Sequence, residues 1–154
     1  MLLKTVIDQA RQEGFIAIAT ALTGVAAILL PGGRTLHSKL KVPIESLTED
    51  SLLQCTGQKN GTRALLEKAS LLVIDEATMM ERRILKTIDR TLRRFKSPAK
   101  PFGGLTLVLS GDWRQTLPVI PRAPRAEIVS ETLKGTKYKY LFLLTKNLVS
   151  SIIF

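Results

Sequence analysis

The sequence predicts an α/β domain with a mainly parallel sheet flanked by helices. Short apolar runs such as 71–74 and 105–110 show little polar alternation, which is typical of strands covered on both faces. Segments with helical spacing separate these runs, as the crossover connections between parallel strands require. With 154 residues, the chain has the length of one domain with a substantial core.

The charge composition indicates a polyanionic partner. The 23 Lys and Arg residues outnumber the 13 Asp and Glu residues, and the net charge of +10 makes nucleic acid the simplest partner. The single cysteine, Cys55, excludes an internal disulfide and a cysteine-cluster metal site. No apolar run approaches the roughly 20 residues of a membrane span, so we expect neither a membrane partner nor a secretory leader.

The first element is expected to be a helix over residues 2–12, ended by Gly14. It contains Lys4 and Thr5, the residue types that end a phosphate-binding Walker A motif. No glycine precedes them, and a cradle of backbone N–H groups needs a glycine-rich turn. We therefore interpret Lys4 as a surface lysine on a helix.

A strand at 15–20, a turn at Thr23-Gly24 and a short helix from Val25 are expected next. The basic, hydroxyl-rich segment 34–39 is predicted to be a loop suited to phosphate contacts. Its lone histidine, His37, is interpreted as a hydrogen-bonded loop residue, because no second ligand type lies at metal-site spacing beside it.

Two adjacent carboxylates, Asp75 and Glu76, follow the apolar run 71–74. A polar loop at 43–61 and a brief helix at 62–69 are expected to precede this strand. Open α/β folds place ligand chemistry at the carboxyl ends of their strands. Two acids there can hold a divalent cation and orient a water during hydrolysis of a nucleoside triphosphate.

An amphipathic helix is predicted from about Met80 to Phe95. Its apolar residues fall on one arc and its cations on the other, with only Glu81 and Asp89 to offset the positive charge. The segment allows two interpretations, an ordinary solvated face or a self-repelling face that binds nucleic acid. The cations are Arg82, Arg83, Lys86, Arg90, Arg93 and Arg94.

A second polar cluster, 111–115, follows the apolar run 105–110, so two strand ends are expected to build one site along one sheet edge. The segment 97–101 is read as a linker and 102–104 as a turn. Prolines make 117–121 extended, and a last strand is expected at 140–144.

These residues together resemble the Pif-type (petite integration frequency) ATP-dependent DNA helicases of superfamily 1, helitron-type relatives included. The Gly-Asp-x-Arg-Gln segment with its following prolines is the most specific match, and the resemblance covers nearly the whole chain. The matching segments, in the family's order, are 19–27, 30–38, 73–77, 102–104, 111–121 and 144–147.

The resemblance implies a RecA-like P-loop NTPase domain that couples ATP hydrolysis to 5′-to-3′ movement of a monomer on single-stranded DNA. Asp75 matches the residue that holds Mg²⁺ through water, Glu76 the general base, and Gln115 the sensor of the γ-phosphate. The family acts in DNA repair, recombination and telomere maintenance, in the nucleus and, for some members, in mitochondria. The residues expected at the DNA are Thr23, Gly24, Arg34, Thr35, His37 and Lys39, with Arg82, Lys86, Arg90 and Arg93 on the basic helix.

The sequence also departs from the family's pattern. In the family a Walker A strand and loop lie upstream of the segment that matches 2–12, so residues 1–154 correspond to part of the first RecA-like domain, without the second. Leu148-Val149 stands where the family continues to a phosphate-facing arginine. A sheet without its central strand is expected to pair the neighbouring strands directly, because unsatisfied backbone groups cost about 1–3 kcal/mol each.

Three functions remain open from the sequence. The first is the nucleotide-binding domain of a Pif-type helicase, whose chain on its own is expected to be inactive without the phosphate cradle. The second is a truncated or transposon-derived copy with no ATPase activity. The third is a single-stranded DNA-binding module that keeps the basic surface without the motor.

Overall fold

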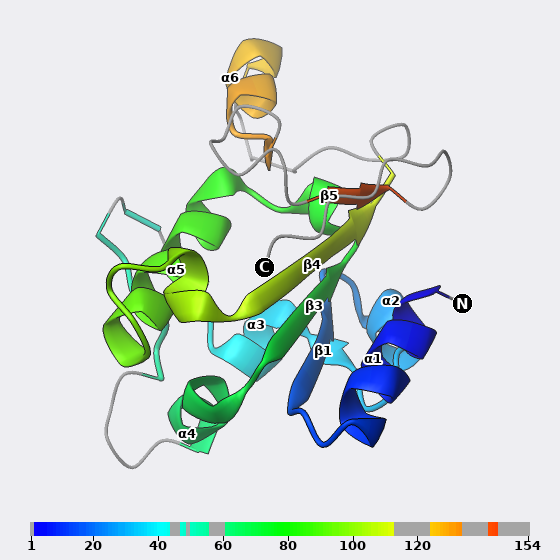
Figure 1. Ribbon diagram of the computed structural model, residues 1–154. Coiled ribbons are helices and arrows are strands. Elements are labelled where there is room, and N and C mark those ends of the chain that lie inside the picture. Colours follow the sequence, from blue (N-terminus) through cyan, green and yellow to red (C-terminus); the bar gives the residue numbers. More distant parts are fainter. Residues whose placement is uncertain are drawn as a thin grey trace.

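A computed structural model describes residues 2–43, 47–48, 50–55, 61–112, 124–133 and 142–144. Its core is a five-stranded sheet in the order β2-β1-β3-β4-β5. All four strand pairs are parallel, which confirms the predicted parallel sheet (Figure 1). These strands follow one another without a break in pairing, and β4 pairs directly with β5. The bounds are β1 Ala17–Ala21, β2 Arg34–Thr35, β3 Leu71–Asp75, β4 Thr106–Gly111 and β5 Phe142–Leu144.

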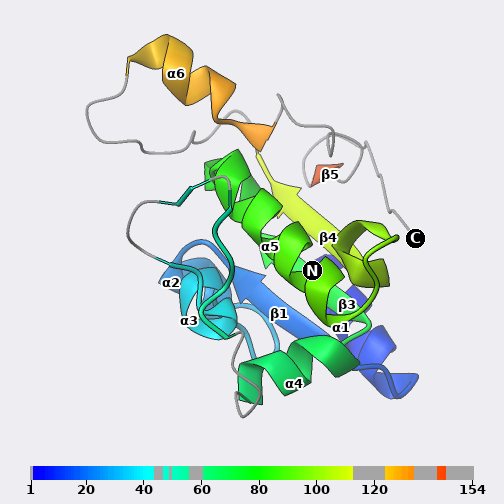
Figure 2. The ribbon, with the colours of Figure 1, turned by 90° about the vertical axis from the view of Figure 1, so that its left-hand side faces the viewer.

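Helices cover both faces of the sheet. In Figures 1 and 2, α1 and α2 lie on one face, and α3, α4 and α5 lie on the other. The sixth helix, α6, lies beyond the N-terminal end of α5 in both views. The bounds are α1 Leu2–Gln12, α2 Gly24–Ile28, α3 Leu36–Leu40, α4 Gly61–Lys68, α5 Arg82–Phe95 and α6 Arg125–Ser130.

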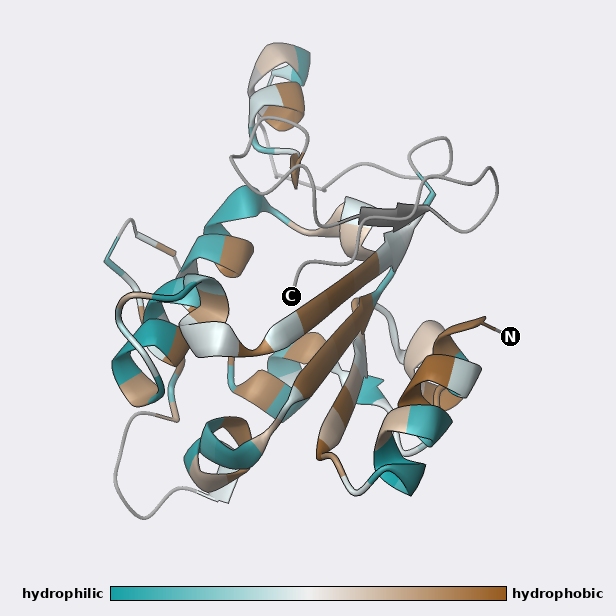
Figure 3. Cartoon of the chain, in the orientation of Figure 1, coloured by the Kyte–Doolittle hydropathy of each residue, from teal (hydrophilic) through white to brown (hydrophobic). Residues whose placement is uncertain are grey.

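The period of two along β3 divides its side chains between two cores. Leu72 and Ile74 belong to the larger core under α3, α4 and α5, whereas Leu71 and Val73 belong to the smaller core under α1 and α2. Figure 3 shows β3 and the middle of β4 as strongly apolar ribbons between the two helical layers. This double coverage explains why the strand sequence lacks polar alternation.

Most predicted elements are present within a residue or two of their expected bounds. Lys4 lies exposed on α1, which confirms that it is a surface lysine of a helix. The loop predicted at 34–39 is wrong, because the segment forms β2 and α3. Leu36 and Leu40 are fully buried and lie one helical turn apart, so their burial favours a helix. The polar residues between them made the segment look like a loop.

The amphipathic helix begins two residues later than predicted. Met80 has an extended backbone and is buried, and a short 3₁₀ helix, η1 Ala77–Met79, separates β3 from α5. The turn expected at 102–104 is part of a second 3₁₀ element, η2 Pro101–Gly104. Helix α6 was not predicted, and the segment 117–121 lies outside the described residues. No described helix is long and apolar enough to span a membrane.

Candidate functional site

The Asp75-Glu76 pair lies at the carboxyl end of β3, between β1 and β4. Because the sheet is parallel, the carboxyl ends of all three strands meet at one edge. Asp75 closes the strand, and Glu76 follows in a left-handed conformation with φ of 55° and ψ of 30°. A residue with a side chain adopts this conformation at a cost of about 1 kcal/mol or more, which is common at functional sites.

Backbone hydrogen bonds hold the left-handed turn in place. The Glu76 N–H donates to Asp75 Oδ1 over 2.9 Å, and the Glu76 carbonyl accepts from the Met79 N–H over 3.0 Å. The Leu22 N–H donates to the Asp75 carbonyl over 3.1 Å, which ties the end of β3 to the residue after β1. These bonds offset the strain and keep both carboxylates at the sheet edge.

The Glu76 carboxylate is bound by the hydroxyl of Thr23. Thr23 Oγ1 donates to Glu76 Oε2 over 2.6 Å, across 53 residues of sequence. The same oxygen accepts from the Ala26 N–H over 3.3 Å and so caps α2. Thr23 was predicted to contact DNA, and the sequence contained no signal for its bond to Glu76.

The end of β4 packs against the turn that follows the acidic pair. Thr78 is buried, and its hydroxyl donates to the Asp112 carbonyl over 3.4 Å. A Cβ on Gly111 would lie 2.9 Å from Thr78 Cγ2, so only glycine fits there without displacing the turn. The ends of β3 and β4 therefore lie together at one edge of the sheet, as expected, for the residues up to Asp112. Gln115, the predicted γ-phosphate sensor, lies outside the described residues.

The two carboxylates suit a hard cation. Mg²⁺ binds one or two carboxylates, keeps several waters and takes further oxygens from substrate phosphates. Asp75 and Glu76 supply carboxylate oxygens, and among the described residues neither has an ion-pair partner. The described residues contain no cluster of three or more metal-binding side chains. A cation at Asp75 and Glu76 would therefore need phosphate and water oxygens as further ligands.

The remaining residues predicted to bind DNA lie on neighbouring elements. Gly24 opens α2, Arg34 and Thr35 form β2 beside β1, and His37 and Lys39 lie on α3. Arg34 is exposed, and Thr35, His37 and Lys39 are half-buried. The structure thus gathers these predicted residues around the end of β1 and its edge strand.

Acceptors inside the molecule lie against four of the α5 cations, Arg82, Arg83, Arg90 and Arg93. Arg82 donates to both carboxylate oxygens of Glu131, over 3.1 and 3.0 Å, and Arg83 lies 3.5 Å from the same carboxylate. The Arg93 Nε donates to Asp89 over 2.9 Å, and the Arg90 Nη1 donates to the Ser51 carbonyl over 2.9 Å. Glu131 supplies a buried carboxylate from a distant part of the sequence, so the positive charge of this face is offset by more than Glu81 and Asp89. The role of this face at the DNA stays a prediction.

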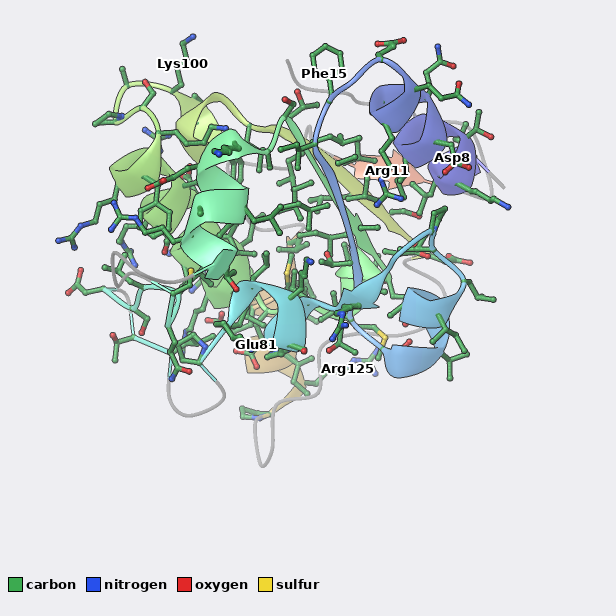
Figure 4. All side chains as sticks on the ribbon, turned by 90° about the horizontal axis from the view of Figure 1, so that it is seen from below. Asp8, Arg11, Phe15, Glu81, Lys100 and Arg125 are labelled. Atoms are coloured by element: carbon green, nitrogen blue, oxygen red, sulfur yellow. The ribbon has the colours of Figure 1, made fainter. Side chains whose placement is uncertain are left out.

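An apolar depression of about 270 Å³ lies at the other end of β3, where that strand begins, against α1. Its lining includes Val6, Ala10 and Leu71, the first residue of β3. Phe15, which is 50% exposed, also lines it and projects from the loop before β1 (Figure 4). The depression is separate from the carboxylates by the length of β3.

Comparison with known proteins decides the family. The family model described as PIF1-like helicase matches residues 1–150. The chain belongs to the PIF1-like helicase family. As a PIF1-like chain it is 35% identical over 122 residues to the ATP-dependent DNA helicase RRM3 of Saccharomyces cerevisiae, which covers 77% of the chain and 17% of the yeast protein. The chain therefore spans about a sixth of the length of that relative.

Solved structures of Pif1 from Bacteroides have the same fold as this PIF1-like chain. The structure bound to single-stranded DNA matches with a TM-score of 0.69 and 34% identity, over 92% of this chain and 34% of that one. The structure in complex with ADP-AlF4 matches with a TM-score of 0.67 and 32% identity, over 93% of this chain and 35% of that one. The parallel sheet with its flanking helices is thus a RecA-like helicase fold.

Proposed function

We propose that the chain is part of the first RecA-like motor domain of an ATP-dependent DNA helicase that moves 5′ to 3′ on single-stranded DNA. The observation that carries the proposal is the carboxylate pair at the end of β3, held by uncharged donors in a chain of the PIF1-like family. The relatives' names and the nucleotide and DNA complexes of Bacteroides Pif1 support the substrate classes. Roles in DNA repair, recombination and telomere maintenance belong to the same proposal.

The residues of the chain have separate tasks in this proposal. Asp75 would hold Mg²⁺, and the cation would supply electrostatic stabilisation of the transferring phosphoryl group. Glu76 accepts the proton of the attacking water and orients it. Gln115 responds to the loss of the γ-phosphate, and the residues around the end of β1 contact the DNA strand. Arg34 and Lys39 provide cations for its phosphates.

Hydrolysis by the full-length product of the gene tests the enzymatic part. Phosphate release stimulated by single-stranded DNA is expected to fall at least about 100-fold in Glu76→Gln, because a general base contributes 10²–10⁴-fold. Glu67→Gln is the matched control, since Glu67 is exposed on α4 and pairs with Arg63. Wild-type hydrolysis in Glu76→Gln would refute the assignment of the base. Unwinding of duplexes with a 3′ tail but not a 5′ tail would refute the polarity.

The 154-residue chain tested on its own addresses the inactive and binding-only alternatives. Its sequence contains no Gly-x-x-x-x-Gly-Lys-[Ser/Thr] motif, so we expect no hydrolysis by this polypeptide alone. Phosphate release above that of Glu76→Gln would contradict this expectation. The net charge of +10 supports binding of single-stranded DNA by the same polypeptide, with an affinity that falls as salt rises.

A further inference from the structure

Thr23 makes two hydrogen bonds with one oxygen, and they differ in kind. Its hydroxyl has a single hydrogen, which goes to Glu76 Oε2 over 2.6 Å. A lone pair of the same oxygen accepts from the Ala26 N–H over 3.3 Å. The bond to Glu76 is short and has an ionised acceptor, which places it among the stronger hydrogen bonds of proteins. Capping of α2 requires only the bond from the Ala26 N–H. The bond to Glu76 must therefore have another role.

The register of the sheet brings Thr23 near Glu76. β1 and β3 are paired through Ala21 and Asp75, and the Leu22 N–H continues this pairing to the Asp75 carbonyl over 3.1 Å. In the same register Glu76 lies opposite Leu22, the residue before Thr23. The pairing therefore brings the first residues after β1 and after β3 together, and there the Thr23 hydroxyl bonds to the Glu76 carboxylate.

The backbone of Glu76 is fixed by its own hydrogen bonds, but its side chain is not. The backbone is held through Asp75 Oδ1 and the Met79 N–H. Within the described part of the chain, no cation lies within ion-pair distance of the Glu76 carboxylate. The Thr23 hydroxyl is thus the contact that selects one direction for a side chain with three rotatable bonds.

We propose that Thr23 is the positioning residue of Glu76, and that its hydroxyl holds Oε2 so that Oε1 is the oxygen presented to the attacking water. This inference rests on the proposed function, in which Glu76 is the general base. A carboxylate offers about four lone-pair sites, so the bond to Thr23 leaves Oε1 free to accept a proton. A misplacement of a reacting group by about 1 Å can cost about 100-fold in rate, so a lost restraint on the base is measurable.

Three substitutions of Thr23 separate positioning from capping. Thr23→Val has the same shape and loses both bonds. Thr23→Ser keeps both bonds. Thr23→Asp keeps a good capping acceptor for the Ala26 N–H, but its ionised side chain cannot donate to Glu76 and repels it. Hydrogen exchange of the Ala26 amide reports directly whether the cap is retained in each variant.

The experiment measures kcat and KM for ATP in the full-length protein at saturating single-stranded DNA, so that a change in DNA affinity does not enter. We expect Thr23→Val and Thr23→Asp to lower kcat about 10- to 100-fold with KM for ATP within about twofold of wild type. Thr23→Ser is expected to restore kcat to within about threefold of wild type. Ala26 amide protection is expected to remain in Thr23→Asp.

Two results would overturn the inference alone. The first is wild-type kcat in Thr23→Val while Glu76→Gln is inactive. The second is a Thr23→Asp variant as active as Thr23→Ser, which would show that only the cap matters. Wild-type hydrolysis in Glu76→Gln is a different failure, because it would remove the proposed general base and with it the function on which the inference rests.

Discussion

The acidic edge of β3 and the basic face of α5 handle charge in opposite ways. Asp75 and Glu76 receive their hydrogen bonds from an amide and a hydroxyl, both uncharged. Arg82 and Arg93 each lie within 3.0 Å of a carboxylate whose side chain is less than 10% exposed. The arginines have their charge compensated by carboxylates inside the fold, and these ion pairs contribute to stability. The carboxylates of Asp75 and Glu76 have only neutral donors, so their negative charge stays uncompensated and can attract a ligand. The net charge of a chain does not distinguish the two.

The largest expected effect tests whether the acidic edge is functional rather than structural. Asp75→Asn keeps the oxygen that accepts the Glu76 N–H and removes the charge. ATP hydrolysis by the full-length protein is expected to fall at least about 100-fold, because the cation loses its carboxylate. The unfolding free energy of the chain in urea should change by less than about 0.5 kcal/mol. A large loss of stability would place Asp75 in the same category as Asp89 and Glu131.

The next effect tests the structural role of the α5 cations. Glu131→Gln leaves Arg82 and Arg83 without their shared carboxylate, which is only 6% exposed. We expect the chain to lose about 2 kcal/mol of unfolding free energy, since a buried charged hydrogen bond is broken at one end. Urea denaturation measures this loss.

Glu67→Gln is the control for Glu131→Gln, because the Glu67 side chain is exposed and its partner Arg63 is only half-buried. Its cost should be about 0.3–0.5 kcal/mol. Equal costs for the two variants would show that the burial of Glu131 adds nothing to its ion pairs.

A smaller effect separates cations that bind DNA from cations that hold the fold. Arg34→Gln is expected to lower the slope of log affinity against log salt for single-stranded DNA by about 0.7, the value for one phosphate contact. Arg82→Gln should leave this slope unchanged, because the guanidinium is bound to Glu131. A salt titration of both variants measures the slopes, and a reduced slope in Arg82→Gln would support the predicted role of Arg82 at the DNA.

The smallest effect concerns Cys55, a buried group with no charge of its own. Burial raises the pKa of this thiol above its ordinary value of 9.0, against smaller lowering effects of a backbone hydrogen bond and of Arg63. The folded state therefore keeps the proton at a pH where the unfolded state has lost it. The contribution of Cys55 to stability is complete below the unfolded pKa and declines as pH rises toward the folded pKa.

Urea denaturation of wild type and Cys55→Ala at pH 7.5 and pH 9.5 measures this decline. The difference in unfolding free energy between the two proteins should shrink at the higher pH. Taking the difference removes the opposite contribution of Lys96, whose pKa is lowered by burial and which therefore favours folding more as pH rises toward 10.5. A pH-independent difference would show that the thiol titrates alike in both states.

Local patterns were sufficient for the sheet and for most helices. The run Leu71–Ile74 is buried on both faces, as its lack of alternation predicted, and the apolar arc of α5 packs against the larger core. Leu36 and Leu40 show where such reasoning failed, because two apolar residues in a polar segment form too short a pattern to identify α3. The position of Glu131 beside Arg82 depends on tertiary structure over 49 residues of sequence, which no local pattern contains.

The acidic residues of the candidate site could be predicted from the sequence, but the hydrogen bonds that position them could not. Asp75 and Glu76 could be placed at a strand end from the sequence, but the bond from Thr23 required the register of β1 on β3. Phe102-Gly103-Gly104 was one of the segments that match the family, and no physical reason for its glycines was evident from the sequence. In the structure Gly103 has φ of 63°, and a Cβ there would lie 2.5 Å from the Leu92 carbonyl oxygen, so its role is to fit η2 against α5.

The parallel pairing of β1 with β3 has a consequence for the order in which the chain folds. Thr20 bonds to the Val73 carbonyl across 53 residues of sequence, with α2, β2, α3 and α4 synthesised in between. At about 5–20 residues per second, a ribosome takes roughly 3–10 seconds to make that interval. Until β3 has been made, the partner of β1 in the described sheet is β2, a strand of only two residues. The apolar segment Ala17–Ala21 therefore waits for its longer partner during synthesis, with the unpaired edge that makes a nascent chain prone to aggregation.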